Sequence, residues 1–82
     1  MPSEEIGREL KASELKPGTV VIVKPPGNKP LITVWVRNID PCVVEFYAGE
    51  MRWHILNFIM EDGSIKDDQG RIVRVFEYLG EV

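Results

Sequence analysis

The side chains best suited to nucleophilic chemistry are scarce in this chain. It contains one cysteine, Cys42, and one histidine, His54. Nucleophilic catalysis needs a nucleophile and a base within hydrogen-bond reach, and a third group that orients the base. In the hairpin predicted below, His54 faces Glu45 while Cys42 points to the opposite side of the sheet. We therefore expect Cys42 to be a small buried residue, His54 to be a half-exposed strand residue paired with Glu45, and the chain not to be an enzyme.

The sequence does not indicate a metal-binding or a phosphate-binding site either. A zinc site needs three or four Cys or His ligands, and the chain offers one of each. The acidic residues between positions 61 and 68 do not have the spacing of a calcium-binding loop, and two solvated turns explain them better. The glycines are single turn residues, with no G-x-G-x-x-G pattern after a strand. We expect no cofactor, no metal and no small-molecule substrate.

A binding surface is the remaining candidate for a functional site. In the strand predicted over residues 31–38, aliphatic residues alternate with Thr33, Trp35 and Arg37. Because successive side chains of a strand point to opposite faces, Trp35 and Arg37 point outward when the aliphatic side forms the core. The next strand along the chain adds Tyr47, with Arg52 expected opposite it across the hairpin.

Aromatic side chains flanked by arginines suit two kinds of partner. They can stack the bases of a single-stranded nucleic acid or anchor a protein contact, in which Trp, Tyr and Arg dominate the energetics. The apolar residues at the end of the hairpin extend this surface and favour a protein partner or a second copy of the chain. We predict a non-catalytic interaction module that uses this face or the proline-rich loop at residues 25–30, with nucleic-acid binding as the alternative. The predicted binding residues are Trp35, Arg37, Tyr47, Arg52, Leu56 and Phe58.

A purely structural interpretation of the same residues competes with this one. Tyr47 and Arg52 could form a cation–π pair, and the N-terminal segment could cover Trp35.

A β-hairpin over residues 42–57 positions most of these side chains. Gly49 and Glu50 suit a two-residue turn, because glycine adopts positive φ at little cost. That turn sorts apolar and polar residues onto opposite faces, and a one-residue slip would destroy the sorting. A helix over residues 51–60 is the competing interpretation. The predicted pairs are Ala48 with Met51, Tyr47 with Arg52, Phe46 with Trp53, Glu45 with His54, Val44 with Ile55, and Val43 with Leu56.

The other segments complete a mainly β fold. Short strands are predicted over residues 19–24, 31–38, 65–66 and 71–78, separated by turns rich in Pro, Gly, Asn and Asp. The first of them is dense enough in β-branched residues to be buried on both faces. Five or six short strands joined by tight turns predict a small antiparallel SH3-like barrel or a strongly bent sheet.

The N-terminal residues have a different pattern. Ser3 could cap a helix, acidic residues follow in its first turn, and Ile6 and Leu10 lie four apart. We expect a short helix over residues 3–12 or a frayed tail. The chain thus divides into an N-terminal segment, 1–14, and one small β domain, 15–82.

Composition limits the function classes. At 82 residues the chain can form one small core without metals or disulfides. Its formal net charge of −3 argues mildly against bulk electrostatic binding of polyanions. No run approaches the length of about 20 apolar residues that crosses a bilayer, and the first residues lack the features of a signal peptide. We expect a cytoplasmic protein with no membrane partner.

Overall fold

The computed structural model describes residues 6–48 and 53–80, with the side chains of residues 53–56 outside that description. This part of the chain contains seven strands and one short 3-10 helix. Each strand predicted after residue 18 is present. In chain order the elements are β1 (Ile6–Leu10), η2 (Ala12–Glu14), β2 (Val20–Lys24), β3 (Ile32–Ile39), β4 (Val43–Ala48), β5 (Trp53–Ile59), β6 (Ile65–Lys66) and β7 (Ile72–Tyr78).

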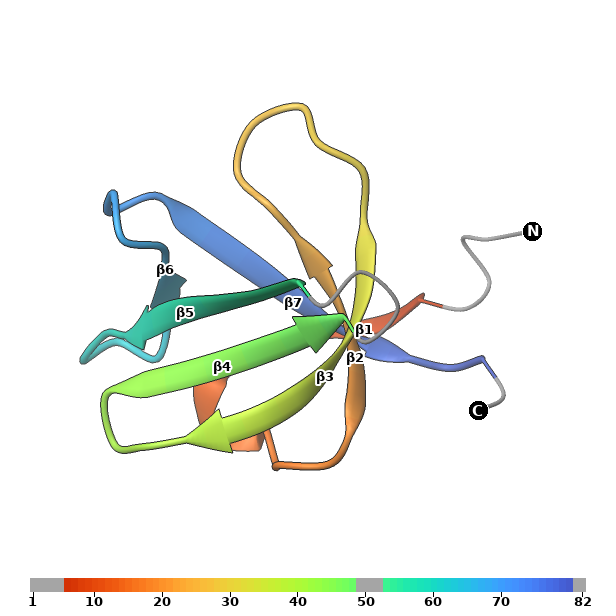
Figure 1. The fold of residues 1–82 in the computed structure, drawn as a ribbon, viewed down its shortest axis with the longest axis horizontal. Coiled ribbons are helices and arrows are strands. Elements are labelled where there is room, and N and C mark those ends of the chain that lie inside the picture. The colour runs from red at the N-terminus through yellow and green to blue at the C-terminus, as the bar shows by residue number, and fades with distance from the viewer. Residues whose placement is uncertain (1–5, 49–52, 81–82) are drawn as a thin grey trace.

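The strands form one antiparallel sheet that closes into a barrel (Figure 1). Their order is β1-β7-β2-β3-β4-β5-β6, and β6 pairs back onto β7. The closing pairs are Ile65 with Val73 and Lys66 with Ile72. The strands from β2 to β7 therefore make a closed six-stranded barrel, and β1 is an extra strand on β7. The predicted small antiparallel barrel is confirmed.

Described side chains of the barrel strands alternate between the interior and the outer surface. On β3, Val34 and Val36 are buried while Trp35 and Arg37 are exposed, as the period-two pattern predicts. On β4, Phe46 is fully buried. β-Branched residues suit such a core because they pack well on a pleated surface. The buried apolar residues of the core are Ala12, Leu15, Val21, Val23, Val34, Val36, Val44, Phe46, Ala48, Ile65, Val73 and Val75.

Strand β2 is buried on both faces, also as predicted. Val21 and Val23 belong to the core, whereas Ile22 is buried on the outer side of the sheet. There it lies between Thr33 of β3 and Phe76 of β7 in the register. The outer side of the barrel thus carries apolar residues of its own next to Trp35.

The β4–β5 hairpin is present, but its register differs from the predicted one. Tyr47 lies opposite His54, Phe46 opposite Ile55, and Glu45 opposite Leu56, a shift of two residues. The predicted pairs are therefore wrong, and the predicted turn at Gly49 and Glu50 lies outside the described residues. Because the shift is an even number, it leaves the alternation of faces intact.

An asparagine lies on the inward side of β5. Asn57 lies opposite Val44 and is fully buried. Its neighbour Phe58 lies opposite Val43 and is exposed. A strand with regular alternation therefore continues through residues 57–59, and the competing helix over residues 51–60 is not formed at residues 53–59.

The N-terminal segment belongs to the sheet. Residues 6–10 form β1, which runs antiparallel to β7 with Leu10 opposite Val75. Within the described residues the predicted helix over residues 3–12 is therefore wrong, because residues 6–10 are a strand. A helix this short is marginal in water without tertiary packing. Pairing with β7 instead satisfies main-chain groups and places Leu10 against the core.

Gly7 allows a close approach between β1 and β7. The register shifts between Ile6 and Glu9, and Gly7 lies in that interval. A Cβ added at Gly7 would lie 2.7 Å from the Cβ of Glu77. Glycine is the residue that tolerates so close a neighbour.

Ion pairs hold β1 in place from both sides. Arg74 donates to the two carboxylate oxygens of Glu9 at 2.9 and 3.1 Å. Arg8 donates to Glu14 at 2.6 Å and lies 3.9 Å from Glu77. The hydrogen bond from Arg74 lowers the pKa of Glu9, and the hydrogen bond from Arg8 lowers the pKa of Glu14. Since these charges are exposed, salt will screen them.

The 3-10 helix η2 joins β1 to the body of the barrel. Ala12 and Leu15 are buried in the core. The main-chain N–H of Ala12 donates to the carbonyl oxygen of Gly63 at 3.3 Å. This contact ties the N-terminal segment to the turn before β6.

No helix in the described ranges has the length and apolarity to cross a membrane.

The ion pair between Glu9 and Arg74 makes a pH-dependent prediction. A carboxylate whose folded pKa is lowered stabilises the fold above its unfolded pKa, about 4.3, and that contribution disappears as pH falls through the folded value. We expect Glu9→Gln to lower the urea midpoint at pH 6 and to leave it unchanged at about pH 3. The control is Glu61→Gln, because Glu61 forms no ion pair within the described part of the chain. A Glu9→Gln effect of equal size at both pH values would contradict the prediction.

Candidate functional site

Pairing of β3 with β4 places Trp35 beside Tyr47. The two residues are direct partners in the register. Their ring centroids lie 6.2 Å apart, and the ring planes are inclined by 28°. Trp35 nevertheless remains 44% exposed. A stacked aromatic pair that keeps one large ring open to solvent is therefore the main feature of this side of the barrel.

Arg37 completes the stack. Its guanidinium carbon lies 5.0 Å from the centroid of the Tyr47 ring, within the range of a cation–π interaction. The β3–β4 register shifts between Val36 and Asn38, so Arg37 lies at an irregularity of the ladder. Such irregularities commonly re-aim a side chain. The predicted cation–π partner, Arg52, lies outside the described residues.

Strand β4 extends the aromatic surface toward β5. Tyr47 and Val43 lie four residues apart on the outer side of β4, about 13 Å along an extended strand. Val43 is the register partner of Phe58, which is 38% exposed. We call this outer surface of β3, β4 and β5 the aromatic face. It comprises Trp35, Arg37, Val43, Tyr47 and Phe58.

A shallow hollow lies beside Trp35, on the side away from Tyr47. Val20 of β2 is the register partner of Trp35, and Tyr78 of β7 lies beyond it. The hollow has a volume of about 160 Å³ and a mainly apolar lining. Its lining residues are Val20, Thr33, Val34, Trp35 and Tyr78.

Four of the six predicted binding residues lie on one side of the sheet, namely Trp35, Arg37, Tyr47 and Phe58. Leu56 lies opposite Glu45 in the register, but its side chain is outside the description, as is the whole of Arg52. The competing interpretation, in which the N-terminal segment covers Trp35, is wrong for residues 6–14, because β1 pairs with β7 and Trp35 is exposed.

Tyr78 and Val20 are contributors that the sequence did not reveal. The alternation of buried Val73 and Val75 with the residues beside them could have placed Tyr78 on the outer side of β7. It could not have shown that β7 lies next to β2, because that pairing joins strands about fifty residues apart.

The residues considered for nucleophilic chemistry are not brought together. Cys42 is exposed in the turn that precedes β4, so the prediction that it is buried is wrong. The physical reason is that β4 begins only at Val43. His54 lies opposite Tyr47 in the register instead of Glu45, and its side chain is outside the description.

Two of the acidic residues between positions 61 and 68, Asp62 and Asp67, stabilise turns. Asp62 accepts hydrogen bonds from the main-chain N–H and the hydroxyl of Ser64, at 2.9 and 2.6 Å. Asp67 accepts from the main-chain N–H groups of Gln69 and Arg71, both at 2.9 Å. The Ser64 hydroxyl lowers the pKa of Asp62, and the Arg71 N–H lowers that of Asp67. Among the described residues, no group of three or more His, Cys, Asp or Glu could hold a metal ion.

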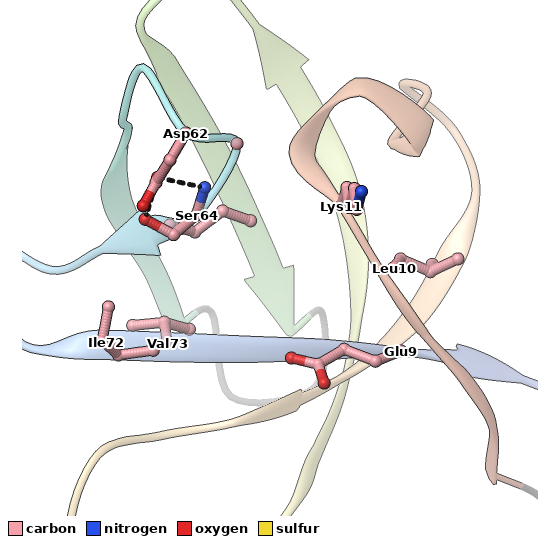
Figure 2. A pocket seen from close by; sticks show the side chains of 9 residues that line it. Glu9, Leu10, Lys11, Asp62, Ser64, Ile72 and Val73 are labelled. Atoms are coloured by element: carbon pink, nitrogen blue, oxygen red, sulfur yellow. Dashed lines mark hydrogen bonds between the residues drawn. The ribbon is translucent and has the colours of Figure 1, made fainter.

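A crevice of about 310 Å³ lies between the end of β1, the turn before β6, and β7 (Figure 2). Its carboxylates already have partners, since Glu9 accepts from Arg74 and Asp62 accepts from Ser64. The rest of its surface is largely apolar, without a set of convergent polar groups that could orient a substrate. Its lining residues are Glu9, Leu10, Lys11, Asp62, Gly63, Ser64, Ile65, Ile72 and Val73.

Comparison with known proteins adds no assignment. No family model, no curated protein and no solved structure matches the chain. Function must therefore be inferred from the chemistry of the surface itself.

The stack makes a quantitative prediction. In a double-mutant cycle of Arg37→Ala and Tyr47→Leu, we expect a coupling of about 0.5–1 kcal/mol in the free energy of unfolding, because the cation lies over the ring at an exposed site. Urea unfolding of the unaltered chain, the two single variants and the double variant measures this coupling. The control cycle pairs Tyr47→Leu with Lys24→Ala, since Lys24 lies at the far end of β2. A coupling no larger than that of the control cycle would show that the ring and the guanidinium do not interact.

Proposed function

We propose that this chain is a non-catalytic interaction module that contacts a protein partner through the aromatic face. The observation that carries the proposal is the exposure of Trp35 within a stack that already includes Tyr47 and Arg37. Trp, Tyr and Arg are the residues most enriched at energetic hot spots of protein interfaces. Trp35 stacks on Tyr47, and Arg37 lies over the Tyr47 ring, so the Trp35 ring is held in place before a partner binds. A partner that contacts Trp35 therefore causes a smaller loss of conformational entropy.

The shape and apolarity of the surface support a protein partner. Val43 and Phe58 extend the face by apolar area, and the hollow beside Trp35 offers a place for a side chain. Aromatic anchors surrounded by other apolar groups are typical of the central part of a protein interface.

The charges favour a protein over a nucleic acid. Affinity for a phosphate backbone comes mainly from several lysines and arginines along its path. Within the described part of the chain, Arg37 is the cation of the aromatic face, and the whole chain has a formal net charge of −3. A single-stranded nucleic acid could stack on Trp35, but it would find few partners for its phosphates.

Selection of a randomised peptide library displayed on phage, with the folded chain as bait, tests the proposal. The selected peptides are synthesised, and their dissociation constants are measured by fluorescence anisotropy. We expect Trp35→Ala to weaken binding at least about tenfold, as truncation of a hot-spot residue does. Ile72→Ala is the matched control, because Ile72 is 49% exposed but lies at the β6–β7 pairing, away from the aromatic face.

Two results would contradict the proposal. One is a set of selected peptides that bind Trp35→Ala as tightly as the unaltered chain, with circular dichroism showing both folded. The other combines two observations. A twelve-nucleotide oligo(dT) quenches tryptophan fluorescence at low salt, and Trp35→Ala abolishes the quenching, while no selected peptide depends on Trp35 for binding. That outcome would assign the face to nucleic acid.

A further inference from the structure

The hollow beside Trp35 lies between two aromatic residues. Trp35 of β3 pairs with Val20 of β2, and Val21 pairs with Glu77 of β7. Because β2 and β7 run antiparallel, the next position of that register places Tyr78 opposite Val20. Trp35 and Tyr78 therefore belong to strands on either side of β2, about 10 Å apart across two strand spacings, and both line the hollow.

The hollow is uncharged and small. None of its five lining residues carries a charge, and its volume of about 160 Å³ is close to that of a cavity of about 150 Å³ that holds benzene. The depression that shares Val20 and Tyr78 with it balances two basic against two acidic lining residues, namely Arg8, Lys16, Glu14 and Glu77. These charges favour neither an acidic nor a basic ligand. The hollow therefore has room for one uncharged ring or aliphatic side chain.

Trp35 and Tyr47 carry hydrogen-bond donors that the folded chain does not use. In the described part of the chain the rings of the two residues contact each other, but the indole N–H of Trp35 and the hydroxyl of Tyr47 form no hydrogen bond. The indole N–H can only donate, and the phenol hydroxyl can donate as well. A ligand that displaces water from these groups must therefore offer acceptors in its place, because an unsatisfied donor is costly.

Three common modes of peptide recognition do not suit this face. Addition of a β-strand requires an exposed sheet edge, whereas β2, β3 and β4 each pair with a strand on both sides. An amphipathic helix requires an apolar groove for anchors at positions i to i+7, which span about 10 Å along its axis, and the hollow has room for one side chain. Recognition of phosphorylated or acidic motifs requires a cluster of arginines, and the hollow has no charged lining residue.

Recognition of a proline-rich segment is the mode that these features support. Such segments dock as a polyproline II helix on grooves lined by aromatic residues. The pyrrolidine ring of proline is uncharged and apolar, so it matches a hollow between Trp35 and Tyr78. Polyproline II makes no internal hydrogen bonds, and its carbonyl oxygens are therefore open to donors such as the Trp35 N–H. Because its backbone is already ordered, its binding costs little conformational entropy.

We infer that the ligand of the aromatic face is a proline-rich segment of another protein, bound as a polyproline II helix with one proline in the hollow between Trp35 and Tyr78. This inference rests on the proposed function and specifies its partner. Main-chain carbonyls of the segment accept hydrogen bonds from the indole N–H of Trp35 and the hydroxyl of Tyr47. The proline ring supplies apolar contact, while the hydrogen bonds fix the position of the backbone.

Alanine substitution within the bound peptides tests the ligand. Peptides selected from the randomised library on the unaltered chain should be enriched in proline, with circular dichroism of the free peptides showing polyproline II. Each proline of a selected peptide is replaced by alanine in turn. We expect at least one replacement to weaken binding about fivefold or more, because alanine loses both the ring contact and the ordered backbone. A peptide of the same composition in scrambled order is the control.

Filling the hollow tests the site. Thr33 is exposed and lines the hollow, so Thr33→Leu should narrow it without altering the core. We expect a loss of peptide affinity of about fivefold or more. Thr33→Ser, which keeps the space, is the matched control and should bind as the unaltered chain does. Circular dichroism confirms that both variants fold.

Removal of one donor tests the hydrogen bonding. Tyr47→Phe keeps the ring and its stack on Trp35 but lacks the hydroxyl. We expect it to weaken peptide binding about threefold or more, because a ligand carbonyl loses its partner. The urea midpoint should stay unchanged, because within the described residues the hydroxyl makes no hydrogen bond in the folded chain. Unchanged peptide affinity in Tyr47→Phe would contradict this part of the inference.

The outcomes separate the inference from the proposed function. Peptides that need Trp35 but lack proline enrichment, whose prolines all tolerate alanine, or that bind Thr33→Leu unchanged, would overturn the inference and leave the proposed function intact. The absence of any peptide that depends on Trp35 would remove both. Sedimentation equilibrium supplies a third arm, since the chain has three prolines of its own within residues 25–30. A dimer that Trp35→Ala dissociates would show that a second copy occupies the face, which also overturns the inference.

Discussion

Closure of the sheet through the β6–β7 pairing is the constraint on which the rest of the structure depends. A closed barrel of six short strands encloses only the inward side of each strand. Valines of β2, β3 and β4 and the ring of Phe46 fill that interior. Residues on the outward side of β3 and β4 are therefore exposed to solvent unless another molecule covers them, and Trp35 is one of these exposed residues.

The parts of the fold that depend on short-range periodicity could be predicted from the sequence. The alternation along residues 32–37 identified both the buried valines and the outward position of Trp35, because a strand has an exact period of two. The pairing of β3 with β4 follows from their short connection. Together these two features account for the contact between Trp35 and Tyr47.

The parts that depend on pairing between distant segments could not be predicted in the same way. Nothing in residues 6–10 identifies β7 as their partner. The helical spacing of Ile6 and Leu10 therefore predicted a helix where a strand forms. The irregularity of the β3–β4 ladder beside Arg37 is likewise not indicated by any residue type. The predicted hairpin register was wrong because a shift of two residues preserves the same alternation, so the sorting of residues between faces cannot distinguish the two registers.

Trp35 lies on an open surface of a folded barrel, and the proposed binding role depends on that exposure. Hydroxyl-radical footprinting in dilute solution, read by mass spectrometry, tests it most directly. We predict that Trp35 is oxidised rapidly under conditions in which Phe46 of the same folded chain remains protected. Protection of Trp35 comparable to that of Phe46 would show that the ring is covered and would contradict its proposed role as an exposed anchor.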